Sequence, residues 1–299
     1  MLAFLAVAGV LFAAGCGDEA SSDGSSVLAV ATTTQVADLV RNVGGNRVAV
    51  EQILEPNSDP HGYEPRPSDA ASVAEADVVF RSGGDLDEWL GDLIDNAGGD
   101  APAIDLAGSV GGQEDDPHWW QDPRNAVKAV AAIEAALVEA DAEGAKRYRA
   151  NAQIYTARLR RLDRSIARCI DRIPPGQRRL VTTHDALGYY ADRYGIEVVG
   201  ALIPSLSTAA QPSAGDIERL VDQIERQGVK AVFPESSLNP KLERAVSRET
   251  GAAVGQALWA DTLGSEGSSG ETYVGSIQAN TEALVDGLTG GEESCRPKA

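Results

Sequence analysis

The sequence contains little histidine: three residues among 299, at His61, His118 and His184. It has no His-Glu-x-x-His motif, which excludes the helical zinc site typical of many metalloproteases, and it has no long histidine-rich segment. Each histidine lies in a loop at the expected boundary of a helix or strand. Because neutral imidazole is the commonest metal ligand in proteins, we hypothesise that all three serve one metal centre.

Basic residues are also few. The chain has 26 Lys and Arg against 45 Asp and Glu, a formal net charge of −19 at pH 7. This excess argues against nucleic acid or an anionic membrane surface as the partner, and it suits the attraction of cations. Net negative charge also keeps a protein soluble, so charge alone leaves both interpretations open.

Cysteine occurs three times, and the first, Cys16, ends the apolar run of residues 1–16. This run is shorter than the roughly 20 residues of a membrane span. Small residues before Cys16 resemble a bacterial lipobox, although the basic residues that usually begin a signal peptide are missing. We expect residues 1–16 to be a lipoprotein signal peptide, Cys16 to carry a lipid anchor, and the Gly/Ser/Asp-rich residues 17–26 to be a flexible tether. The alternative is a buried helix of the mature domain.

Apolar runs alternate with helical periodicity over residues 27–140, which indicates a lobe with a parallel sheet covered by helices. No strand-like run follows between Arg124 and Pro174. Apolar residues at helical spacing predict one helix from Ala142 to Ile173, roughly 45–50 Å long.

The alternation of strands and helices returns at Leu180 and predicts a second α/β lobe over residues 175–299, so residues 141–174 would link the lobes. The sequence therefore predicts an α/β fold with two lobes, each built on a parallel sheet, joined by one long helix. Cys169 and Cys295 remain, and two cysteines in an exported protein are expected to form a disulfide. This bond would pin the carboxyl-terminal tail to the second lobe.

Four candidate ligands follow strand-like runs: His61, His184, Glu235 and Asp261. Ligands of such sheets bind beyond the carboxyl ends of the strands. His118 lies on the loop that leaves the first lobe. Because the candidates come from both lobes, we expect a metal site in the interlobe cleft.

Four segments carry a resemblance to a known family. They are DPHGYEP at 59–65, DPHWWQDP at 116–123, THDALGY at 183–189 and DTLG at 261–264. In these segments the chain resembles the zinc- and manganese-binding substrate-binding proteins of bacterial ABC importers, of the cluster A-I type. The resemblance extends from Val27 to about Leu288. Gln121 stands where the family more usually has an aliphatic residue.

The resemblance implies that His61, His118, His184 and Asp261 are the metal ligands. Asp261 has an alternative role, since it could cap the turn that follows it. Glu235 competes with Asp261: its carboxylate could bind the metal directly or orient a histidine.

The implied function is extracytoplasmic capture of a divalent metal ion and its delivery to the membrane subunits of an ABC permease. The protein would be a monomer anchored to the cell membrane as a lipoprotein, with no nucleic-acid partner. Four protein ligands and no position for water describe a closed site, which favours binding over catalysis, so the protein is not expected to be an enzyme. The alternatives are a zinc-dependent hydrolase of the cell envelope or an adhesin, for which no obvious module is present.

Zinc is the favoured ion and manganese the second choice. Three imidazoles and one carboxylate suit a tetrahedral zinc centre, whereas manganese prefers oxygen-rich ligation. In manganese-preferring relatives a glutamate often replaces the third histidine, and here His184 is present. We expect binding to be lost as the histidines protonate below about pH 6.

Overall fold

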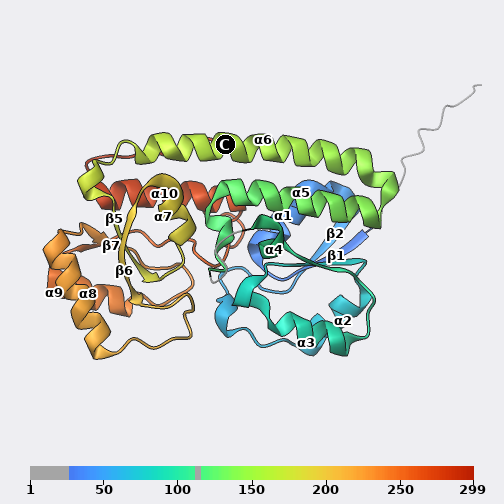
Figure 1. Ribbon diagram of the computed structural model, residues 1–299, viewed down its shortest axis with the longest axis horizontal. Coiled ribbons are helices and arrows are strands. Elements are labelled where there is room, and N and C mark those ends of the chain that lie inside the picture. Colours follow the sequence, from blue (N-terminus) through green and yellow to red (C-terminus); the bar gives the residue numbers. More distant parts are fainter. Residues whose placement is uncertain (1–26, 112–115) are drawn as a thin grey trace, which may run out of the picture.

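The structure is a computed structural model that describes residues 27–111 and 116–299. It shows two α/β lobes side by side beneath a layer of helices, with the long helix α6 running along both (Figure 1). The expected signal peptide (1–16), the anchor at Cys16 and the tether (17–26) lie outside the described residues. None of the helices in the described residues has the length and apolar character of a membrane span.

The first lobe is built on a four-stranded parallel sheet in the order β2-β1-β3-β4. Its strands are β1 (Val27–Ala31), β2 (Val48–Gln52), β3 (Val78–Arg81) and β4 (Ala103–Asp105), and the connecting helices are α1 (Thr34–Gly44), α2 (Pro67–Glu75), α3 (Trp89–Ala97) and α4 (Leu106–Val110). Successive residues of β1 pack into different clusters: Ala29 and Ala31 join one core, and Val30 joins another with Leu90 of α3. Both faces of the sheet are therefore covered, as expected of parallel strands.

The second lobe repeats this strand order in two two-stranded sheets. It contains β5 (Arg179–His184), β6 (Glu197–Ile203), β7 (Ala231–Val232), β8 (Ala253–Val254) and the helices α7 (Gly188–Tyr194), α8 (Ala214–Gln227), α9 (Lys241–Thr250) and α10 (Tyr273–Thr289). The pairs β5-β6 and β7-β8 are parallel, and a parallel bridge between Thr182 and Phe233 joins them into the order β6-β5-β7-β8. Two α/β lobes with parallel sheets are thus confirmed.

Helix α5 (Pro123–Ala140) packs on the first lobe and leads into α6 (Ala145–Ile170). The predicted helix from Ala142 to Ile173 is three residues too long at each end. Residues 142–144 form a 3₁₀ turn capped by Asp141, and Pro174 keeps the preceding residues from continuing the helix. Helix α6 packs against α5, α1 and α10, so it contacts helices of both lobes.

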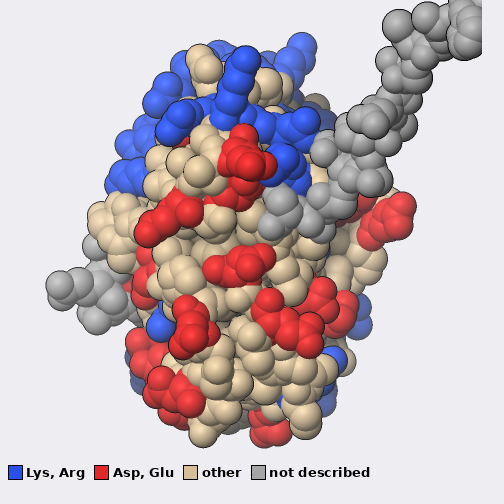
Figure 2. Space-filling model, turned by 90° about the vertical axis from the view of Figure 1, so that its right-hand side faces the viewer, with Lys and Arg blue, Asp and Glu red and all other residues tan. Residues whose placement is uncertain are grey.

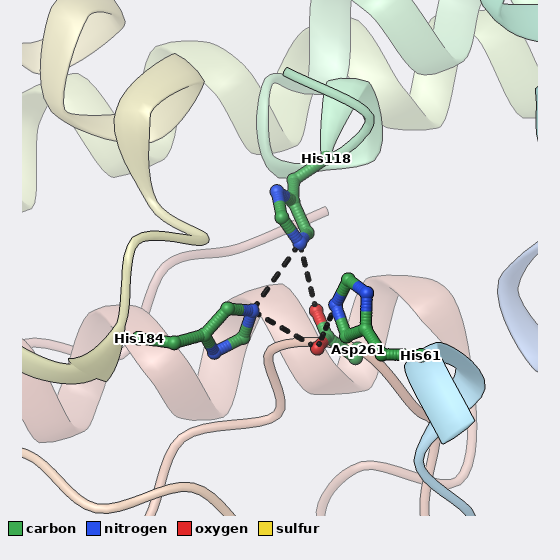
Figure 3. A group of neighbouring side chains, drawn as sticks. All are labelled: His61, His118, His184 and Asp261. Atoms are coloured by element: carbon green, nitrogen blue, oxygen red, sulfur yellow. Dashed lines mark hydrogen bonds and ion pairs between the residues drawn. The ribbon is translucent and has the colours of Figure 1, made fainter. Parts of the chain in front are cut away.

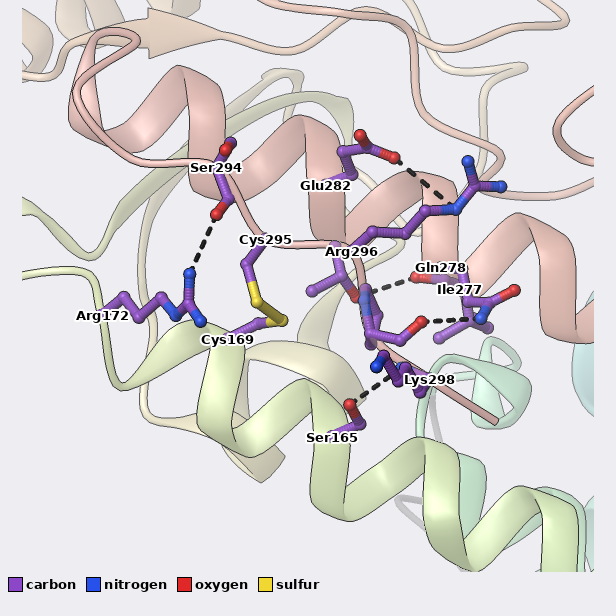
Figure 4. Close-up of a disulfide and its surroundings, with 12 residues drawn as sticks. Ser165, Cys169, Arg172, Ile277, Gln278, Glu282, Ser294, Cys295, Arg296 and Lys298 are labelled. Carbon is purple, nitrogen blue, oxygen red and sulfur yellow. Dashed lines mark hydrogen bonds and ion pairs between the residues drawn. A yellow bond between two sulfur atoms is a disulfide. The ribbon is translucent and has the colours of Figure 1, made fainter.

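The predicted disulfide between Cys169 and Cys295 is present, with a Cα–Cα distance of 5.5 Å (Figure 4). It ties the tail after α10 to the end of α6. Two hydrogen bonds extend this contact: the Arg172 guanidinium donates to the Ser294 carbonyl (3.1 Å), and the Lys298 backbone N–H donates to the Ser165 hydroxyl (2.8 Å). The carboxyl terminus is therefore held against α6 over several residues.

Candidate metal centre

Each lobe contributes two residues to a cluster between them (Figure 3). From the first lobe, His61 lies in the 3₁₀ turn Pro60–Gly62, and His118 directly precedes the turn Trp119–Gln121. From the second lobe, His184 is the last residue of β5, and Asp261 lies just after the bridge residue Leu258. The structure thus brings together the four residues that the sequence singled out as ligands.

The donor atoms of the cluster are spaced as the ligands of one small cation would be. The Nε2 atoms of His118 and His184 are 3.3 Å apart, and those of His61 and His184 lie 3.2 and 3.1 Å from Oδ2 of Asp261. Nε2 of His118 lies 3.4 Å from Oδ1 of Asp261, and all four donors fall within 4.8 Å of one another. Tetrahedral ligation at about 2.0–2.1 Å places neighbouring ligand atoms roughly 3.3 Å apart.

Carboxylates fix the orientation of two of the imidazole rings. Nδ1 of His118 lies 2.8 Å from Oδ1 of Asp116, and Nδ1 of His184 lies 2.5 Å from Oε1 of Glu235. Each carboxylate also accepts a hydrogen bond from the backbone N–H of the same histidine. Glu235 therefore contacts the outer side of a ring and does not join the cluster. Asp116 has the same role, which the sequence reasoning missed.

This arrangement sets the tautomer of both rings. An ionised carboxylate only accepts hydrogen bonds, so Nδ1 of His118 and of His184 carries the proton. In the neutral rings, each Nε2 then presents a lone pair to the other and to Asp261. Lone pairs that face one another across 3.3 Å repel unless a cation or a proton lies among them. The cluster is thus built for a positive charge.

The pKa values of the clustered residues also indicate that the cluster favours a positive charge. Burial opposes a charge on His184, but the carboxylates of Asp261 and Glu235 outweigh burial and raise the pKa of His184 from 6.5 to about 11. Burial also raises the pKa of Asp261, but His184 and His118 outweigh it and hold that pKa well below its usual value. Burial raises the pKa of Glu235. When no metal is bound, a proton on His184 therefore supplies the positive charge.

His61 lies at the more open edge of the cluster. No carboxylate of the described residues bonds to its Nδ1, and it borders a cavity of about 290 Å³ that Asp85 and residues 205–207 also line. Its backbone N–H donates to Oδ1 of Asp59 (3.0 Å), whose Oδ2 accepts a hydrogen bond from Thr208 of the second lobe (2.6 Å). His61 is therefore positioned through its backbone, beside a bond that joins the two lobes.

Two side chains of the first lobe hold the backbone next to Asp261. Both Nε1 of Trp120 (2.9 Å) and Nε2 of Gln121 (2.8 Å) donate to the carbonyl of Ala260. An aliphatic residue in place of Gln121 could not make this bond. The unusual residue at this position thus helps to place the only carboxylate of the cluster.

The fold and the cluster define a class: two-lobed binding proteins that hold a cation between rigid α/β lobes. The chain belongs to the ZnuA family, described as zinc-uptake complex component A, periplasmic, whose sequence profile matches residues 29–287. It is thus the extracytoplasmic metal-binding component of an ABC metal transporter and not an enzyme, which removes the hydrolase alternative. Binding proteins of this family deliver a metal ion to an ABC permease.

The relatives differ in the metal that they are named for. The chain is 34% identical to the manganese-binding lipoprotein MntA of Halalkalibacterium halodurans over 288 residues, which are 93% of this chain and 95% of the relative. It is 29% identical to the iron-binding protein YfeA of Yersinia pestis over 298 residues, 96% of this chain and 95% of the relative. The periplasmic zinc-binding protein TroA of Treponema pallidum superimposes with a TM-score of 0.82 at 29% identity, over 88% of this chain and 99% of TroA.

Proposed function

We propose that the protein captures a divalent metal ion with His61, His118, His184 and Asp261 as its four ligands. The observation that carries this proposal is the convergence of these four donor atoms within 4.8 Å of one another. Two of the rings have Nδ1 bound to a carboxylate, so their Nε2 lone pairs point into the cluster. A carboxylate that binds the Nδ1–H group of a histidine ligand raises the basicity of the ring and fixes its orientation.

Zinc is the proposed cargo, with manganese second. Three nitrogen donors and one carboxylate favour zinc, because zinc accepts tetrahedral coordination and ranks above manganese in affinity for nitrogen-rich sites. The short donor separations support the compact, tetrahedral coordination that zinc accepts. Since the relatives are named for manganese, zinc or iron, their names do not decide between the ions.

The test is a competition titration of purified, metal-free protein with zinc and manganese, supported by elemental analysis of the protein as isolated. We expect tighter binding of zinc. His184→Glu should weaken zinc binding and narrow the gap to manganese, because it exchanges a nitrogen ligand for an oxygen ligand. Tighter manganese binding by the unchanged protein would contradict the zinc assignment and leave the transport function intact.

The wider context of this function is part of the proposal. The lipoprotein signal peptide is removed by cleavage before Cys16, and Cys16 is lipidated and anchors the monomeric protein to the outer side of the cell membrane. Residues 27–140 and 175–299 form the lobes, and residues 141–174 link them. Cys16→Ser should release the protein from membranes or leave the precursor uncleaved. Recovery of the unchanged protein in soluble form with Met1 still attached would refute the anchor.

A further inference from the structure

Helix α6 carries a concentration of positive charge that contrasts with the rest of the chain. Eight of the 26 basic residues and one of the 45 acidic residues lie within its span of Ala145–Ile170. All eight are exposed, while the one acidic residue, Asp163, is buried and paired with Arg193. Figure 2 shows Lys and Arg gathered at the top of the molecule, over α6, and Asp and Glu mostly below.

The basic side chains on the exposed face of α6 have few acidic partners among the described residues. Arg160, Arg161, Arg164 and Arg168 form no ion pair with any described residue. The carboxyl-terminal tail extends the same face, because the bond from its backbone to Ser165 places the exposed Lys298 beside the helix. The inner face is apolar and packs on α5, α1 and α10. The basic face is thus fixed in place and turned toward solvent.

One apolar side chain interrupts this basic face. Ile154 is 69% exposed, the most exposed of the large hydrophobic residues in the described part of the chain. It lies four and seven residues before Arg158 and Arg161, so the three side chains share one side of the helix. Clustered basic residues attract anionic headgroups, and an exposed aliphatic side chain among them can enter the boundary of the bilayer. A soluble polyanion would gain nothing from Ile154.

The described part of the chain begins at Val27, near the beginning of this helix. Val27 pairs with Val48 at the start of β2, and the preceding Arg47 bonds to Asp141 (2.9 Å), four residues before α6. The ten residues of the tether, 17–26, span at most about 35 Å. A lipid on Cys16 would therefore keep the start of α6 within reach of the bilayer.

We propose that the outer face of α6, together with Lys298, binds the anionic headgroups of the membrane to which the protein is anchored. This inference rests on the proposed lipoprotein anchor. The net charge of −19 predicts repulsion from such a surface, but a contact is governed by charges within about one Debye length, roughly 10 Å at 0.1 M salt. In this orientation the two lobes lie on the side of α6 away from the bilayer (Figure 1).

The test is sedimentation of the unlipidated chain from residue 17 onward, which retains every described element, with vesicles of phosphatidylcholine alone or with 30% phosphatidylglycerol. We expect binding only to the anionic vesicles and its loss in 1 M salt, where the Debye length falls to about 3 Å. Replacing Arg160, Arg161, Arg164 and Arg168 by Gln should weaken binding at least about tenfold. The matched control replaces four exposed basic residues of α8 and α9, Arg226, Lys241, Arg244 and Arg248, and should leave binding unchanged.

A second pair of variants separates a bilayer from a soluble polyanion. Ile154→Gln should reduce vesicle binding about fivefold, whereas Leu242→Gln, at another exposed aliphatic residue, should not. The proposal is overturned if anionic vesicles do not bind, if the two four-residue variants behave alike, or if Ile154→Gln has no effect while soluble polyphosphate binds as well as the vesicles. Zinc titration of each variant reports the metal site separately. If the chain from residue 17 onward binds anionic vesicles while mass spectrometry of the exported full-length protein shows an unmodified Cys16, the anchor is refuted and the α6 surface is supported.

Discussion

Two segments of this chain have the same sequence, Asp-Pro-His, at 59–61 and 116–118, yet they hold their histidines differently. In both, the carboxylate accepts a hydrogen bond from the backbone N–H of the histidine. Asp116 uses the same oxygen to bind the ring of His118, whereas Asp59 turns its second oxygen to Thr208 in the other lobe. One segment therefore fixes the direction of a lone pair, and the other fixes the contact between the lobes.

The largest effect should separate the two histidines themselves. His118→Ala removes a proposed ligand and leaves the carboxylate of Asp116 without its ring partner, so binding of both zinc and manganese should be abolished. His61→Ala should weaken binding less, by about one hundredfold, because water from the adjoining cavity can take the empty position. Isothermal titration of both variants measures the difference. Equal losses would show that the two positions are equivalent.

The next effect concerns the carboxylates. Glu235→Gln and Asp116→Asn retain the size of each side chain but remove its charge, and they should weaken zinc binding by about 10- to 100-fold. Asp59→Asn is the matched control, since Asp59 bonds to the backbone of His61 and not to its ring. This variant should lose less zinc affinity than Glu235→Gln or Asp116→Asn. A larger loss of zinc affinity in Asp59→Asn than in Asp116→Asn would show that Asp59 contributes more to metal binding than Asp116 does.

Protons should compete with the metal at His184. Its pKa is raised from 6.5 to about 11, so the metal-free site is protonated at neutral pH and must release that proton to bind zinc. Apparent affinity should therefore rise about tenfold per pH unit from pH 6.5 to 8, with one proton released. Titration calorimetry in buffers of different ionisation enthalpy counts this proton.

The raised pKa of His184 also makes the folding stability of the metal-free protein depend on pH. Because the folded-state pKa is the higher one, the protonated ring stabilises the metal-free protein fully below about pH 6.5, and this contribution is lost as the pH rises toward 11. Denaturant unfolding of metal-free protein at pH 6.5 and 9 measures the loss. A metal affinity independent of pH over the same range, with no proton released, would contradict both expectations.

Much of the fold could be predicted from the sequence, because the patterns that indicate strands and helices involve residues close together in the chain. The apolar strands and the capping of α8 by Ser213 follow directly from periodicity and residue type. Helix α9 gives a much weaker sequence signal, because its two main apolar residues, Leu242 and Val246, stand among charged residues. The largely apolar segment Ala252–Leu258 forms only the two residues of β8 and a bridge at Leu258.

For the candidate site, the sequence predicts which residues cluster but not the roles of the residues around them. The four clustered residues could be proposed from their motifs and from their positions after strands. The different roles of Asp59 and Asp116 could not, since the two motifs are identical and the difference depends on Thr208, which is 149 residues away from Asp59. Net charge is similarly coarse, because a sum over the chain hides the basic face of α6.

The smallest effect should come from the bond between the lobes. Thr208→Val retains the shape of the side chain but removes the hydroxyl that donates to Asp59. Asp59 then supports the backbone of His61 without being tied to the second lobe, so zinc should dissociate about two- to fivefold faster, which corresponds to the loss of one hydrogen bond. Stopped-flow transfer of zinc to a chelator measures this rate. Ser207→Ala is the control, since the Ser207 hydroxyl accepts a hydrogen bond from the backbone N–H of Ala209 within its own loop and bonds to no residue of the first lobe among the described residues. Unchanged dissociation in Thr208→Val, or equal acceleration in both variants, would show that this bond does not retain the metal.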